Sequence, residues 1–292
     1  MKRPKRISLV LGSGGARGYA HIGVIEELTK HGMEIASISG ASMGALVGAL
    51  YATGSMQAYK EWVLGLDALD LASLIDLSWD SRGLVEGEKI FGKLRELMGE
   101  AKIEELPIRY TAVATDLLRN KEVWFQSGDL LRAVRASIAI PTFFTPVEME
   151  GMLLVDGGAL NPLPVAPTMA DTTEMTLAVN VYADKPFRPV PLKAAERKKQ
   201  NEADRIIDAL MKHAKKWVDK EESEYHLFDI MDMTLDSMQK TLIGYRLGGY
   251  PADRIIEVSK DVCGTYDFHK ASSVIEAGRE AARNMLEKEG WI

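Results

Sequence analysis

The chain has 292 residues, and its 42 acidic residues outnumber its 36 lysines and arginines, which gives a formal net charge of −6. Because no overall positive field attracts phosphates, this charge argues against a nucleic-acid-binding function. Hydrophobic residues make up 46% of the sequence, a share typical of globular proteins that bury a sizeable core. The single cysteine, Cys263, rules out an internal disulfide and favours a reducing compartment.

Basic residues at the amino terminus precede an apolar run, but residues 7–11 are too few for the hydrophobic region of a signal peptide. No stretch of the sequence approaches the ~20 apolar residues that a membrane-spanning helix needs. We therefore expect a cytoplasmic protein whose contact with a membrane, where it occurs, is peripheral.

Two successive units of strand, turn and helix open the chain. Residues 7–11 are short, apolar and followed by glycine, as a buried strand is, and residues 19–30 have apolar side chains at helical spacing. Residues 35–39 are a second expected strand. Residues 45–52 form a helix that is apolar on nearly every side, which is typical of a buried helix. This order predicts an α/β fold with a parallel sheet covered by helices.

The same pattern continues along the chain. We expect mainly helical structure over 58–104, helices over 130–136, 227–247 and 271–288, and strands over 110–114, 123–125, 147–149, 152–155, 176–181 and 255–258. Thr115 and Asp116 are expected in a loop, and residues 176–181 are expected to be the last core strand.

A change in composition divides the sequence. Half of residues 191–224 are charged, with both signs mixed. We therefore expect a core at 7–185, a charged amphipathic insertion at 186–226, and helices and a strand at 227–292 that complete the domain.

The pentapeptide from Gly40 to Gly44 has the form G-x-S-x-G and contains Ser42 and Met43. Between a buried strand and a buried helix, this pattern predicts a sharp turn that projects a nucleophilic serine. The glycines leave room where the backbone is tight. The helix that begins at Met43 points its N–H groups at the place where an oxyanion forms. The alternative interpretation is a purely structural glycine turn.

A second glycine-rich turn covers residues 12–18, with successive N–H groups that no side chain obstructs. Such a loop at the start of a helix can hold a phosphate, a carboxylate or an oxyanion. A dinucleotide-binding loop is disfavoured, because Arg17 stands where the third glycine of that pattern belongs.

Asp156 comes at the end of an apolar strand and is followed by Gly157 and Gly158. Asp-Gly alone is commonly a turn. Beside a nucleophilic serine, however, an acid at the end of a strand is a credible general base. A serine–histidine–aspartate triad needs a histidine, and no motif surrounds any of the five in the chain: His21, His31, His213, His226 and His269. This favours a mechanism with two residues.

Four short blocks together resemble those of the patatin-like phospholipase family, in the same order and with the same spacing. They are residues 14–18, 40–44, 136–141 and 156–158. The resemblance is strong over about residues 7–170. It extends more loosely over residues 250–282 to bacterial proteins related to neuropathy target esterase. Ser13 departs from the all-glycine form of the first block and could adjust the oxyanion hole.

The resemblance implies a three-layer α/β/α fold and a catalytic dyad of Ser42 and Asp156, with no metal or organic cofactor. It implies an oxyanion hole from the N–H groups of Gly14 and Gly15, with a contribution from Met43. It also implies that the rest of the loop has a supporting role: Gly12, Ala16, Arg17 and Gly18. Ser137 and Pro141 are expected to be structural.

The expected function is hydrolysis of a phospholipid or another acyl ester, with a homo-oligomer left open. Two alternatives are an α/β-hydrolase with a histidine triad and an inactive lipid- or partner-binding protein. An acyltransferase differs only in the acceptor of the acyl group. Residues 205–220 carry an apolar stripe with Trp217 and several lysines, so we hypothesise that they contact membranes. Nearby acids weaken that attraction, and a helix packed on the core is the alternative.

Overall fold

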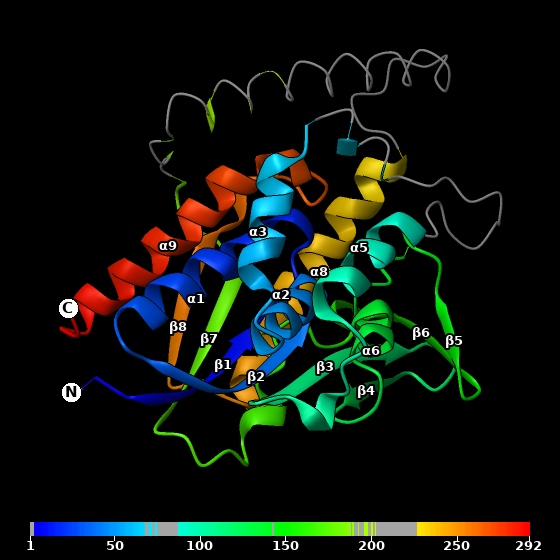
Figure 1. Cartoon of the computed structure of the whole chain (residues 1–292), viewed down its shortest axis with the longest axis horizontal. Helices are drawn as coiled ribbons and strands as arrows, with labels where there is room; N and C mark the ends of the chain where they lie inside the picture. The colour runs from blue at the N-terminus through cyan, green and yellow to red at the C-terminus, as the bar shows by residue number, and fades with distance from the viewer. Residues whose placement is uncertain are drawn as a thin grey trace.

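A computed structural model describes residues 3–67, 87–141, 143–187 and 227–292, with a few residues between these ranges. The strands in the described residues form one eight-stranded sheet (Figure 1). The strands are β1 (Arg6–Leu11), β2 (Glu34–Ala41), β3 (Arg109–Asp116), β4 (Lys121–Phe125), β5 (Val147–Met149), β6 (Met152–Asp156), β7 (Met175–Ala183) and β8 (Arg254–Ser259). The helices are α1 (Ala20–Lys30), α2 (Met43–Ala52), α3 (Met56–Gly65), α5 (Glu88–Met98), α6 (Leu130–Ser137), α8 (Leu227–Gly249) and α9 (Ala271–Lys288).

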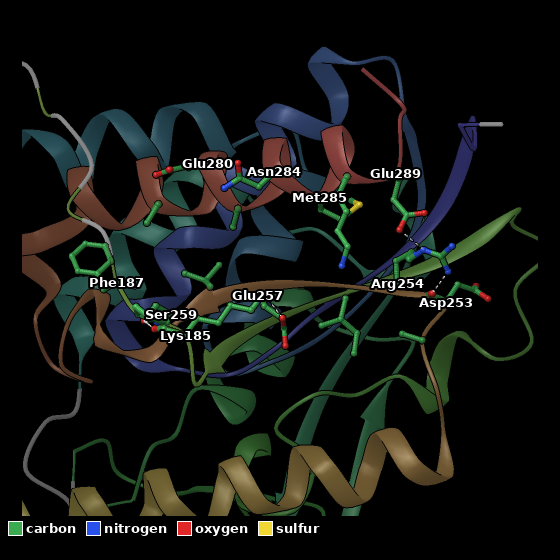
Figure 2. Close-up of a pocket in the computed structure, with 17 residues that line it drawn as sticks. Lys185, Phe187, Asp253, Arg254, Glu257, Ser259, Glu280, Asn284, Met285 and Glu289 are labelled. Atoms are coloured by element: carbon green, nitrogen blue, oxygen red, sulfur yellow. Dashed lines mark hydrogen bonds and ion pairs between the residues drawn. The ribbon is translucent and has the colours of Figure 1, made fainter. Parts of the chain in front are cut away.

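The centre of the sheet is parallel, in the order β3-β2-β1-β7-β8, and the antiparallel strands β4, β5 and β6 lie at the β3 end. Strand β1 lies at the middle, and every residue of it after Arg6 is buried. A strand covered on both faces is mostly apolar, which explains its sequence, and the buried Ser8 hydroxyl donates to Asp171 at 2.8 Å. Helices α9 and α8 lie on opposite faces of the sheet (Figure 2). This confirms the predicted α/β/α arrangement.

Short 3₁₀ turns lie at the ends of several strands. The two used below are η1 (Gly15–Tyr19) and η3 (Gly157–Ala159). Helix α1 begins immediately after η1 and packs along α9. Gly23 and Gly278 make this approach close, because a Cβ on Gly23 would lie 1.9 Å from the Ile275 carbonyl oxygen.

Two predictions about strands were wrong. Thr115 and Asp116 do not form a loop but end β3, because both residues pair with β4 on one edge and β6 on the other. Residues 176–181 are not the last core strand, since β8 adds to β7 in parallel and buries Ile256 and Val258. Strand order in a sheet depends on long-range pairing, which local sequence patterns do not contain.

The expected helical region at 58–104 contains α3 and α5, followed by the turn Ile103–Glu105. The hypothesised amphipathic helix at 205–220 lies outside the described residues, as does most of the charged insertion. Among the helices that the structure describes, none combines the length and the apolar character needed to span a membrane.

Candidate active site

Ser42 lies at the sharp turn between β2 and α2. Its backbone adopts φ 54° and ψ −130°, a conformation that non-glycine residues rarely adopt and that costs on the order of 1–3 kcal/mol. Both flanking glycines are required sterically. A Cβ on Gly44 would lie 2.1 Å from the Leu11 carbonyl oxygen, and a Cβ on Gly40 would lie 2.5 Å from the Ala45 nitrogen. The predicted strand–turn–helix setting of the nucleophile is therefore present.

Strand β3 brings Ser42 and Asp156 together. Residues Ala112 and Val113 pair with β2 and also with β4, so β2 and β4 lie on opposite edges of β3. The end of β3 pairs with β4 and also with β6, which puts β6 on the same edge as β2. These two strands approach each other from opposite directions. Strand β2 ends with Ala41 opposite Val113, and β6 ends with Asp156 opposite the next residue, Ala114.

Asp156 is buried, with 3% of its surface exposed. Its Oδ1 accepts a hydrogen bond of 2.7 Å from the Gly158 N–H, whereas Oδ2 has no hydrogen-bond partner in the described part of the chain. Burial raises the pKa of the carboxyl group to about 6, although the nearby Ser42 hydroxyl and the Gly158 N–H both favour the charged form. A carboxylate with a pKa in this range can take and return a proton near neutral pH.

The segment that ends α6 holds both residues in place. The Ser137 hydroxyl accepts a hydrogen bond of 3.0 Å from the Ser42 N–H and donates one of 2.7 Å to the Val113 carbonyl. Two residues later, the Ala139 carbonyl accepts a hydrogen bond of 2.9 Å from the Asp156 N–H. These contacts agree with the structural role expected for Ser137.

The predicted oxyanion loop follows β1. Gly14 and Gly15 both have positive φ angles, 145° and 54°, and side chains there would collide with Val181 and Thr265. The Ser13 N–H donates to the Pro162 carbonyl at 2.9 Å, which fixes the start of the loop. Among the described residues, no group accepts a hydrogen bond from the N–H of Gly14 or Gly15. These two donors therefore remain available to a ligand.

The glycine loop and the β2–α2 turn that carries Ser42 touch each other through small residues. A Cβ on Gly18 would lie 2.3 Å from the Met43 Cβ, and a Cβ on Gly44 would lie 2.6 Å from the Gly12 carbonyl oxygen. Met43 is the first residue of α2, so its N–H has no acceptor within the helix. The glycines therefore let the N–H groups of Gly14 and Gly15 approach the N–H group of Met43.

Arg17 fixes the far end of the loop. Its Nε donates to the carbonyls of Lys260 and Cys263, each at 3.0 Å, and its two terminal nitrogens donate to Asp236 on α8 at 2.7 and 3.2 Å. Burial alone would lower the pKa of Arg17, but the Asp236 carboxylate outweighs this effect and raises it. The guanidinium also lies over the Tyr182 ring, 5.3 Å from the ring centre.

Helix α8 contributes a second residue at this point. The Gln239 side-chain oxygen accepts hydrogen bonds from the Ser13 hydroxyl at 3.1 Å and from the Tyr182 hydroxyl. No sequence signal distinguished Gln239 or Asp236, which lie about 220 positions after the loop they contact. Tyr182 could have been identified, because it lies at the carboxyl end of a parallel strand, where ligand sites gather.

The Patatin family model, described as patatin-like phospholipase, matches residues 9–169. The chain belongs to the patatin-like phospholipase family. An uncharacterized NTE family protein of Mycobacterium tuberculosis is 39% identical over 97% of this chain and 91% of its own length. Patatin-like phospholipase domain-containing protein 6 of Mus musculus is 31% identical over 60% of this chain and 13% of its own length.

Among solved structures, VipD from Legionella pneumophila has 15% identity and a TM-score of 0.48, covering 98% of this chain and 67% of its own. The family membership supports a lipid hydrolase in general terms. All four motif blocks lie within the matched residues, whereas α8, β8 and α9 lie beyond them.

Two of the three described histidines of this patatin-like protein have contacts away from Ser42 and Asp156. His21 is fully buried, and its Nε2 donates to the Gly12 carbonyl at 2.7 Å, so it supports the glycine loop. Burial lowers the pKa of His21 to about 4, which keeps the ring neutral. His31 lies 3.2 Å from the Glu27 carboxylate at the end of α1. His213 and His226 lie outside the described residues.

A separate pocket of about 750 Å³ lies between β8, α9 and the segment that follows β7 (Figure 2). Charged side chains of both signs line it, and several are paired with each other, such as Arg254 with Glu289 at 2.8 Å and Lys185 with Glu257. None of the predicted site residues lines this pocket. The candidate active site is therefore the contact between the β2–α2 turn, the glycine loop and the end of β6.

Proposed function

We propose that this protein is a serine esterase of the phospholipase A or lysophospholipase type that acts through Ser42 and Asp156. The supporting observation is the meeting of β2 and β6 on one edge of β3, which brings a strained serine beside a buried carboxylate. The pKa of about 6 for that carboxylate suits a general base at neutral pH. No other residue of the mechanism has to carry charge.

In the first half of the reaction, the Ser42 oxygen attacks the ester carbonyl carbon while Asp156 takes the hydroxyl proton. The carbonyl oxygen becomes an oxyanion, and the N–H groups of Gly14, Gly15 and Met43 donate to it. When the tetrahedral intermediate collapses, the bond to the leaving alcohol breaks. Asp156 returns its proton to that alcohol, and the acyl group stays on Ser42.

In the second half, Asp156 takes a proton from a water molecule whose oxygen attacks the acyl-enzyme. The same N–H groups stabilise the second oxyanion. Collapse releases the fatty acid, and the proton on Asp156 returns to the Ser42 oxygen. Each half begins and ends with the carboxylate deprotonated, so one residue serves as base and then as acid.

The nucleophile is tested with a fluorophosphonate, which reacts with activated serines and mimics the tetrahedral state. Intact-mass measurement should find one adduct on the wild type and none on Ser42→Ala. The exposed Ser237 provides a matched control, and Ser237→Ala should label like the wild type. A folded wild-type protein that takes no label would contradict the assignment of Ser42.

The reaction class is tested by incubating the protein with phospholipid vesicles in ¹⁸O-labelled water. Hydrolysis through an acyl-enzyme places one labelled oxygen in the released fatty acid, together with an equal amount of lysophospholipid. Transfer to another acceptor gives an acylated product without the label. Loss of both products in Ser42→Ala ties them to this site.

A further inference from the structure

Helix α8 has an unusual distribution of side chains. Three of its polar residues face the protein: Asp236 pairs with Arg17, Gln239 accepts from Ser13, and Arg246 donates to the Leu160 carbonyl at 2.8 Å. Leu160 directly follows η3, the turn after Asp156. The inward side of this one helix therefore contacts the oxyanion loop and the loop of the candidate base.

The opposite side of α8 is apolar and exposed. We define this outer face by its large exposed side chains, which are Ile230 (52%), Met231 (39%), Met233 (57%), Met238 (53%) and Tyr245 (76%). Among residues 230–249, whose side chains are described, the other exposed positions hold threonine, serine, glycine and Lys240. Lys240 is paired with Asp184 at 2.7 Å.

This arrangement differs from that of an ordinary surface helix, which turns its apolar side to the core and its charges to water. Helix α8 buries Ile243 in the core, yet it also leaves the large apolar side chains of the outer face exposed. A contiguous row of exposed apolar side chains along a helix is typical of a surface that contacts another protein or a membrane. The helix cannot simply be rotated to hide them, because its inward polar residues are fixed by the Arg17–Asp236 pair and by the hydrogen bonds of Gln239 and Arg246.

We propose that the outer face of α8 is the surface by which this protein binds the lipid aggregate that contains its substrate. The inference rests on the proposed function. Membrane-surface helices bury large apolar and aromatic side chains at the boundary between head groups and acyl chains, and the outer face consists of side chains of this kind. An uncharged face loses no ionic hydration when it enters that boundary.

The size of the outer face distinguishes a lipid surface from a second copy of the chain. A helix of 23 residues is about 34 Å long and about 10 Å wide, so one face presents roughly 340 Å². A stable protein–protein interface needs about 800 Å² from each partner. The outer face falls well short of that area, whereas binding to a lipid surface requires no matching partner.

The position of α8 also fits a lipid surface. Gln239 on its inward side lies so close to Gly158 that a Cβ there would be 2.7 Å from the amide nitrogen. The outer face is thus about one helix diameter, roughly 10 Å, from the loop of the candidate base. A lipid aggregate bound there therefore lies against the helix whose inward side contacts the oxyanion loop and the loop of the candidate base.

The test compares two methionines of similar exposure, Met238 on the outer face at 53% and Met169 at 57%. Met169 is two residues before Asp171, which contacts Ser8 and Arg109. These two residues lie at the amino-terminal ends of β1 and β3, whereas Ser42 follows the carboxyl end of β2. Flotation with phosphatidylcholine vesicles is measured for Met238→Glu and Met169→Glu, each in the Ser42→Ala background. Met238→Glu should weaken binding by about tenfold or more, since one buried methionine contributes that much, while Met169→Glu binds normally.

Activity separates the failure of this surface from the failure of the proposed function. In the protein with Ser42 intact, Met238→Glu should lower hydrolysis of vesicle lipid but not of a water-soluble short-chain ester. Vesicle binding that depends on Met238, without hydrolysis of either substrate, would leave the surface in place and overturn the proposed function. Equal vesicle binding by the two variants overturns the surface. So does a dimer that Met238→Glu dissociates while vesicle binding persists.

Discussion

The Ser137 hydroxyl links the backbone of Ser42 to strand β3. It accepts from the Ser42 N–H at 3.0 Å and donates to the Val113 carbonyl at 2.7 Å, so it stands where β2 stops pairing directly with β3. The hydroxyl uses its one donor and an acceptor site in these two bonds, and an apolar side chain offers neither. The motif block at residues 136–141 therefore supports the β2–α2 turn that carries Ser42.

Ser137→Ala should lower both stability and turnover. The change leaves the Ser42 N–H and the Val113 carbonyl without their partner in a buried place, at a cost of about 1–3 kcal/mol in the free energy of unfolding. Because the nucleophile turn loosens, kcat should fall by about tenfold or more with little change in KM. Denaturant unfolding and steady-state kinetics on a soluble ester measure the two effects.

A serine on β2 provides the control. Ser39 is fully buried, and its hydroxyl has no hydrogen-bond partner among the described residues. Ser39→Ala therefore removes an unsatisfied polar atom and should leave stability and kcat close to those of the wild type. If Ser137→Ala changed stability and kcat as little as Ser39→Ala, Ser137 would not support the turn at Ser42.

Asp156→Asn should fold, lose activity and gain stability at neutral pH. Asparagine keeps an oxygen for the Gly158 N–H but cannot accept a proton, so the rate should fall by at least ~10²-fold. A pKa raised from 3.8 to about 6 means that ionising this buried group costs the folded state on the order of 3 kcal/mol. The neutral asparagine avoids that cost.

The sign of the stability change depends on pH. The folded state binds the Asp156 proton more tightly than the unfolded state, so the stabilisation by the protonated form is complete below the unfolded pKa of 3.8. It is lost as pH rises through about 6. Thermal unfolding should show the variant melting above the wild type at about pH 8, with the difference shrinking towards pH 4. If Asp156→Asn were less stable than the wild type at every pH, the folded protein would stabilise the Asp156 carboxylate and not destabilise it.

The rate should depend on the same ionisation. Only the carboxylate form of Asp156 can accept the Ser42 proton, so kcat/KM on an uncharged ester should fall as pH decreases through about 6, with the slope of one proton. The rate should be level above that pH until another group ionises. A profile that stays flat down to about pH 4 would exclude Asp156 as the base.

Asp236→Asn should weaken the oxyanion loop from a distance. The change removes the charge that pairs with the buried Arg17, and it should lower the free energy of unfolding by about 1–3 kcal/mol. It should also reduce kcat on soluble and vesicle substrates alike, because the loop itself is displaced. Measurements of both esters and of denaturant unfolding test this.

An exposed pair on the same helix is the matched control. Asp184 pairs with Lys240 of α8 and with Lys260, but its side chain is 65% exposed. Surface pairs contribute little, so Asp184→Asn should change stability by less than about 1 kcal/mol and leave kcat unchanged. Equal effects of the two substitutions would show that Asp236 has no special connection to the loop.

The sequence by itself determined the parts of the site that depend on local backbone geometry. The glycines around Ser42 and in the loop before α1 form patterns that can be recognised in the sequence, and Gly14 and Gly15 adopt positive φ angles that favour glycine. The order of apolar and polar side chains also predicted the buried strand at 7–11 and the helices at 45–52 and 271–288.

Only the tertiary structure decided how distant segments meet. That β6 continues the edge of β3 where β2 ends, and so brings Asp156 to Ser42, follows from the register of three strands. The pairing of Arg17 with Asp236 and of Ser13 with Gln239 joins residues that are about 220 positions apart. Such contacts depend on the packing of the whole chain, because polar groups find partners wherever the fold buries them, and no local pattern records which partner that is.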